Sequence, residues 1–186
     1  MTSASLPHIS ELGNLSDTGK SALLDLLFEP SAEIHQTLIP VIKSREFASY
    51  SEFIEACRES FLSLASKSTA ASPDPRLLSI LGSHPRLGAK KVESEQSAAE
   101  QAKLGGESEI LARLNRDYEE RFPGLRYVAF VNGRGRPEIM EDMKARMDRS
   151  DFNKEVDTAL QAMCDIAKDR ASKLPVQATG QAGTNL

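Results

Sequence analysis

The stretch SEFIEACRESFLSL, residues 51–64, carries the clearest helical pattern in the N-terminal half of the chain. Phe53, Cys57, Phe61 and Leu64 recur within it at steps of three or four residues. This spacing places the four side chains on one face of an α-helix, where other elements must cover them. The stretch therefore favours a fold in which helices pack on helices.

A similar periodicity continues on both sides of this stretch. An early helix is predicted from a cap at Ser16 or Asp17 to Pro30, because a proline cannot continue a helix. The remaining helices are predicted at residues 34–42, 77–81, 109–122, 137–147 and 151–174. Together these segments predict a single all-α domain over residues 1–176, a helical bundle of about seven or eight helices.

One segment breaks the helical period. Residues 125–131, LRYVAFV, are rich in β-branched and aromatic side chains, and Asn132-Gly133 after them is a turn signal. Because a lone strand cannot form a sheet, we expect a buried extended segment between helices.

The composition narrows the possible partners. The chain has 186 residues and a formal net charge of -4, and its acidic and basic residues are intermixed. The absence of a basic stripe argues against a nucleic-acid partner, and no apolar run is long enough to predict a membrane span. Cys57 and Cys164 are expected to be reduced thiols of an intracellular protein. Residues 177–186 are small and polar, so we expect a disordered tail.

Residues that can perform acid–base chemistry gather in one short region. His84-Pro85-Arg86-Leu87-Gly88 is followed by Ser97-Ala98-Ala99-Glu100-Gln101. A residue before proline is pushed out of the helical region, so His84 is expected at a helix break, where its ring can reach a cleft. If the second motif is helical, its serine, glutamate and glutamine share one face and can hold a polar ligand.

Other local signals in the sequence compete with these two motifs or fail to match a known kind of site. Glu95-Gln96 competes with Glu100-Gln101, and we prefer the latter because Ser97 supplies a hydroxyl three residues before Glu100. Gly19-Lys20-Ser21 imitates the end of a phosphate-binding loop, but no strand is predicted before it. The three histidines and two cysteines show no metal-ligand spacing, so no metal site is predicted.

The motifs resemble those of the decarboxylase family that acts on 2-oxo-4-hydroxy-4-carboxy-5-ureidoimidazoline (OHCU) in urate degradation. Their order and approximate spacing agree over about half of the chain, and Phe28-Glu29-Pro30 adds a faint match near the N-terminus. Besides the two motifs around His84 and Glu100, the resemblance rests on Leu114-Asn115-Arg116-Asp117-Tyr118-Glu119-Glu120-Arg121-Phe122, on the run from Tyr127 to Arg134, and on Arg170 in the last predicted helix.

This resemblance implies an all-α bundle and a carboxy-lyase that converts OHCU to (S)-allantoin without a cofactor. It also implies a small-molecule substrate and a homodimer. Urate breakdown is often peroxisomal, but the sequence ends Thr184-Asn185-Leu186 and not Ser-Lys-Leu, so we expect a cytoplasmic location with the peroxisome as the alternative. Such a decarboxylation needs no cofactor if donors meet the oxygen on which negative charge develops. The residues that the resemblance assigns to catalysis are His84, Glu100 and Arg170. Those that it assigns to substrate binding are Pro85, Ser97, Gln101, Tyr127 and Val128.

Two other hypotheses stay open, because a fold by itself does not fix a function. One is a noncatalytic helical interaction module on the same scaffold, and the other is an enzyme that acts on another ureido compound. The joint presence of His84, Glu100, Gln101 and Arg170 favours an enzyme, since a purely structural protein has no need of all four.

Overall fold

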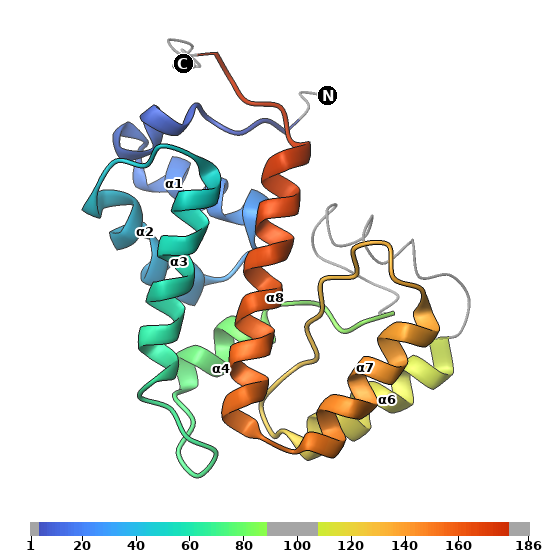
Figure 1. The fold of residues 1–186 in the computed structure, drawn as a ribbon. Coiled ribbons are helices and arrows are strands. Elements are labelled where there is room, and N and C mark those ends of the chain that lie inside the picture. Colours follow the sequence, from blue (N-terminus) through green and yellow to red (C-terminus); the bar gives the residue numbers. More distant parts are fainter. Residues whose placement is uncertain (1–3, 89–107, 179–186) are drawn as a thin grey trace.

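The structure is a computed structural model that describes residues 4–88 and 108–178 (Figure 1). Within these two ranges it contains seven α-helices, one 3₁₀-helix and no named β-strand, which confirms the predicted all-α class. In chain order the elements are η1 (Ile9–Asn14), α1 (Asp17–Leu27), α2 (Ala32–Ser44), α3 (Tyr50–Ala65), α4 (Pro75–Gly82), α6 (Ser108–Arg121), α7 (Arg136–Arg149) and α8 (Phe152–Lys173).

Most of these helices begin at a short polar side chain that accepts a hydrogen bond from the first turn. Ser16 caps α1, Ser49 caps α3 and Asp151 caps α8, each through its side-chain oxygen. Such caps satisfy backbone N–H groups that have no partner inside the helix. α2 runs through Pro40 and ends at Ser44, two residues beyond the end expected from the sequence.

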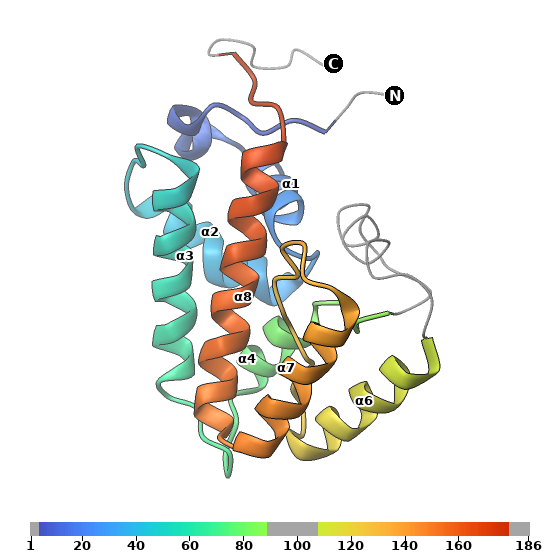
Figure 2. The same cartoon turned by 45° about the vertical axis from the view of Figure 1, so that its right-hand side comes forward.

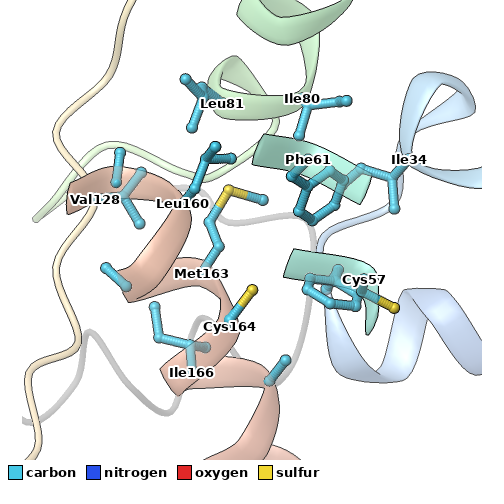
Figure 3. Packing of buried hydrophobic residues seen from close by; sticks show 14 of the residues in the cluster. Ile34, Cys57, Phe61, Ile80, Leu81, Val128, Leu160, Met163, Cys164 and Ile166 are labelled. Atoms are coloured by element: carbon cyan, nitrogen blue, oxygen red, sulfur yellow. The ribbon is translucent and has the colours of Figure 1, made fainter. Parts of the chain in front are cut away.

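The centre of the bundle is the contact between α3 and α8. Phe53, Cys57 and Phe61 on the predicted face of α3 are fully buried. Figure 3 shows Cys57 and Phe61 opposite Met163 and Cys164 of α8. Both cysteines are free and buried. The amphipathic stretch at residues 51–64 therefore packs against the longest helix in the described part of the chain.

The remaining helices stand on two sides of α8. α1 and α2 pack beside α3 and α8, whereas α6 and α7 form a hairpin that lies to one side (Figures 1 and 2). Glu155, near the start of α8, is fully buried and joins this hairpin to the bundle. Its carboxylate accepts hydrogen bonds from the Tyr118 hydroxyl of α6 and from the guanidinium groups of Arg146 and Arg149 of α7.

The segment between α6 and α7 is buried and extended, as predicted. Leu125, Tyr127 and Val128 are at most 2% exposed, and no ladder pairs them with another strand in the part of the chain that the structure describes. The turn after the segment has positive φ angles, 44° at Asn132 and 77° at Gly133, which are the values that Asn-Gly turns adopt.

The two ends of the described chain pair with each other. Leu6 and Val176 form a parallel β-bridge, in which the N–H of Leu6 donates to Pro175 O at 2.8 Å and the N–H of Gln177 donates to Leu6 O at 2.8 Å. The first residue of the predicted tail is therefore hydrogen-bonded, and residues 179–186 lie outside the described ranges.

Candidate active site

His84 lies at the helix break that the sequence predicted. α4 ends at Gly82, and His84 follows in the link that continues through Pro85. The side chain of His84 is only 13% exposed. Within the described residues neither ring nitrogen of His84 has a hydrogen-bond partner, so this imidazole can still bind a ligand.

Helix α6 fixes the loop that carries His84. The side-chain amide of Asn115 donates to Leu87 O at 2.9 Å. Arg86 forms a two-pronged pair with Glu119, with N···O distances of 2.5 and 2.8 Å. The Leu-Asn-x-x-Tyr motif on α6 thus has a local purpose, because it holds the backbone next to His84.

Gly88 closes this loop in a conformation that suits glycine. Its φ is +74°, and a Cβ built there would lie 2.9 Å from Cδ1 of Leu111. A side chain at this position would therefore be strained in the backbone and crowded by α6.

A buried carboxylate that was not predicted from the sequence as a site residue lies next to His84. Glu29 follows α1 directly after Phe28 and is 3% exposed. Its Oε1 lies 3.7 Å from Nδ1 of His84 and accepts a hydrogen bond from Nη2 of Arg170 at 2.8 Å. Nη1 of Arg170 also donates to Phe28 O at 3.1 Å. Three segments far apart in sequence therefore meet at one carboxylate.

The surroundings of His84 keep its imidazole neutral at pH 7. Burial lowers the pKa of His84 from 6.5 to about 4, and the positive charges of Arg170 and Arg126 act in the same direction. The negative charge of Glu29 opposes them. Arg126 also binds the backbone next to the ring, because its Nη1 donates to His84 O at 3.2 Å. A neutral imidazole can accept a proton at physiological pH.

The other predicted site residues divide into two groups. Ser97, Glu100 and Gln101 lie outside the described residues. Tyr127 and Val128 directly follow Arg126, whose guanidinium group contacts the backbone of His84.

The side chain of Tyr127 serves the packing of α7. Its hydroxyl donates to Asp142 Oδ2 at 2.5 Å, and its ring lies under the guanidinium of Arg146. The carbonyl of Val128 accepts a hydrogen bond from Arg146 at 3.0 Å. A contact of Tyr127 or Val128 with substrate stays a prediction, and for Tyr127 it would have to come from the backbone.

Glu29 was missed because nothing local marks it as a site residue. The sequence signal available was the isolated acid in Phe28-Glu29-Pro30, between an apolar helix and a proline. Its partner Arg170 is 141 residues further along the chain. Such a contact follows from how the helices pack, and residue spacing does not reveal it.

A separate hollow of about 600 Å³ opens on another side of α8. Arg58, Lys154 and Gln161 are among the residues that line it, and His84, Glu29 and Arg170 are not. Gln161 precedes Arg170 by nine residues, about two and a half helical turns, so their side chains leave opposite faces of α8. This hollow therefore does not belong to the candidate active site.

In this all-α bundle an imidazole lies next to a buried carboxylate–guanidinium pair. The protein is therefore of the helical class and has a site that can perform acid–base chemistry. Comparison with known families agrees. The sequence profile of the OHCU decarboxylase family matches residues 13–172, so the chain belongs to the OHCU decarboxylase family. This family implies a decarboxylase in urate degradation. A search of curated proteins found no match to the chain.

Proposed function

We propose that this protein converts OHCU to (S)-allantoin and that His84 is its acid–base residue. The observation that carries the proposal is the His84 ring, which is nearly buried and has no hydrogen-bond partner among the described residues, and whose burial lowers its pKa to about 4. A polar side chain in that state is unusual in a folded protein unless a ligand completes it.

The chemistry requires little more than placed proton donors and acceptors. The bond from the ring carbon to the carboxylate breaks, carbon dioxide leaves, and the electron pair stays in the substrate, delocalised toward its oxygen and nitrogen atoms. As the hydroxyl gives up its proton and becomes a carbonyl, a proton is added to the ring carbon that bears the ureido group, which creates the chiral centre of allantoin. A second proton, from water, goes to the ring nitrogen and balances the loss of the carboxylate. His84 takes the hydroxyl proton of the substrate as carbon dioxide is lost, in the role of a general base.

The rest of the proposed site follows from the family resemblance. Ser97, Glu100 and Gln101 would hold the ureido group and the hydroxyl, and Pro85 would form part of the wall beside His84. Arg170 keeps its proposed catalytic role, although its guanidinium also organises Glu29 and Phe28 O. The proposal includes a homodimer and no cofactor. Among the described residues no helix is both long and apolar enough to span a bilayer.

In the test, the two enzymes that precede this step in urate degradation generate the unstable substrate from urate. The formation of chiral allantoin is then followed by circular dichroism. We expect the protein to accelerate its formation, and His84→Asn to lower turnover by about a hundredfold or more. His35→Asn is the matched control, because His35 pairs with Asp25 away from this site.

Three results would contradict the proposal. A wild-type protein without any acceleration would favour the noncatalytic interaction module. Conversion of a different ureido compound in preference to OHCU would favour the second enzyme hypothesis. Equal turnover in His84→Asn and the wild type would remove His84 from the mechanism.

A further inference from the structure

Glu29 occupies a buried position that a charged side chain seldom takes. Its side chain is 3% exposed just after α1, where a carboxylate without a partner would lose its hydration and destabilise the fold. Arg170, itself 4% exposed, supplies a charge-assisted hydrogen bond at 2.8 Å. The pair fixes the carboxylate, since the guanidinium is anchored to Phe28 O on the same loop.

The fixed carboxylate faces one particular nitrogen of His84. The distance from Glu29 Oε1 to His84 Nδ1 is 3.7 Å, which is too long for a hydrogen bond but short enough for a strong charge interaction. The two ring nitrogens lie on different edges of the imidazole. With Nδ1 facing Glu29, Nε2 is the nitrogen that remains for a substrate.

We propose that Glu29 is the positioning residue of His84: its carboxylate, fixed by Arg170, favours a proton on Nδ1 and leaves Nε2 as the atom that accepts the substrate proton. This inference rests on the proposed function of the site. The arrangement follows the general logic by which a carboxylate orients a catalytic imidazole and stabilises its protonated form.

The charges around His84 show why the carboxylate matters. The groups that act on the ring come from three elements: Glu29 after α1, Arg170 on α8 and Arg126 in the extended segment. Both arginines oppose a positive charge on the ring, and among these three groups only Glu29 favours that charge. Without Glu29, proton transfer to His84 would become harder while the shape of the substrate site stayed similar. The expected effect is therefore on kcat more than on KM.

The first experiment measures the tautomer of His84 by ¹⁵N NMR of the wild-type protein at neutral pH. The chain has only three histidines, and His84→Asn assigns the signal. His35, whose Nε2 contacts Asp25 at 2.6 Å, provides an internal reference with a carboxylate at the opposite nitrogen. We expect the proton of His84 on Nδ1. A proton on Nε2 would overturn the proposal, whatever the activity of the protein.

The second experiment replaces the charge of Glu29 while keeping its shape. Glu29→Gln is expected to lower kcat at least about tenfold, to change KM by less than about threefold, and to alter the His84 tautomer signal. Glu29→Asp, which restores a carboxylate, should recover part of kcat and the wild-type tautomer. Asp25→Asn is the control, because it removes the carboxylate next to His35 and leaves the His84 site intact.

Two outcomes of this series would overturn the assignment: an unchanged kcat in folded Glu29→Gln, or an unchanged His84 tautomer signal in that variant. If Glu29→Gln does not fold, the wild-type tautomer decides alone. A protein with the expected tautomer but no decarboxylase activity would contradict the proposed function, and the Glu29–His84 pair would remain.

Discussion

His84 has a charge state that depends on three neighbours and on its burial. In the unfolded chain an imidazole has a pKa of about 6.5, whereas in the folded protein burial lowers the pKa of His84 to about 4. Between these values the unfolded chain binds more protons than the folded protein. The free energy of unfolding must therefore decrease as the pH falls from about 6.5 toward 4.

This linkage gives a prediction for His84→Asn, which cannot take up the proton in either state. Between pH 7 and pH 4.5, wild-type protein should lose roughly 2 to 3 kcal/mol more unfolding free energy than His84→Asn. Urea unfolding at the two pH values measures the difference. Equal losses in both proteins would show that His84 is not held neutral by the fold.

At the same scale, the sequence predicted some site residues and not others for a physical reason. His84 could be found because Pro85 marks a helix break and because few side chains titrate near neutral pH. Glu29 could not, because its importance depends on a guanidinium 141 residues away. Burial and long-range pairing, rather than residue type, turn Glu29 into a site residue.

Among the elements, the loop from His84 to Gly88 is positioned by α6. Four residues of α6 act on this loop or on helices beyond it: Leu111 crowds Gly88, Asn115 binds Leu87 O, Glu119 pairs with Arg86, and Tyr118 reaches Glu155. The helix that the sequence predicted from its apolar face therefore also has a polar face that holds the site loop.

Gly88→Ala tests this anchoring. The substitution places a Cβ at positive φ and 2.9 Å from Leu111, so we expect a loss of about 1 to 3 kcal/mol in unfolding free energy and a fall in turnover. Gly13→Ala is the control, because nothing lies within 4 Å of its Cβ and its φ is not positive. Thermal unfolding of both variants gives the comparison, and a neutral Gly88→Ala would show that the loop can relax.

The helical elements themselves were largely predictable. Serine and aspartate caps, the proline after α1 and the three- and four-residue spacing set most of the boundaries within a few residues. The short η1 helix was not predicted, because it has a single buried residue, Leu12, and no repeating apolar face. Its place depends on contacts with the rest of the bundle.

At the scale of the whole molecule, a buried polar cluster joins the α6–α7 hairpin to the helices around α8. Glu155 is the principal polar connection, since it binds Tyr118, Arg146 and Arg149 from a fully buried position. Removing one partner from a buried charge network leaves the others uncompensated. Loss of one partner from this cluster is therefore expected to destabilise the assembled bundle far more than loss of an ion pair on the surface does.

Glu155→Gln should accordingly lower the free energy of unfolding by about 3 to 5 kcal/mol. Glu141→Gln removes a carboxylate from the exposed Lys144–Glu141 pair and should cost less than about 1 kcal/mol. Limited proteolysis should then cut first within residues 108–149 of Glu155→Gln, because the hairpin is less firmly attached. Matching stabilities of the two variants would refute the role given to Glu155.

The β-bridge between Leu6 and Val176 has a consequence for how the chain can be connected. Because Leu6 and Val176 lie side by side, a short linker can join the two ends of the described chain, and new ends can be opened in the exposed loop at Ala70 and Ala71. In such a circular permutant α8 is followed by η1 and then by α1. The 141-residue separation of Glu29 and Arg170 is then replaced by a several-fold shorter one, so their contact closes a much smaller loop.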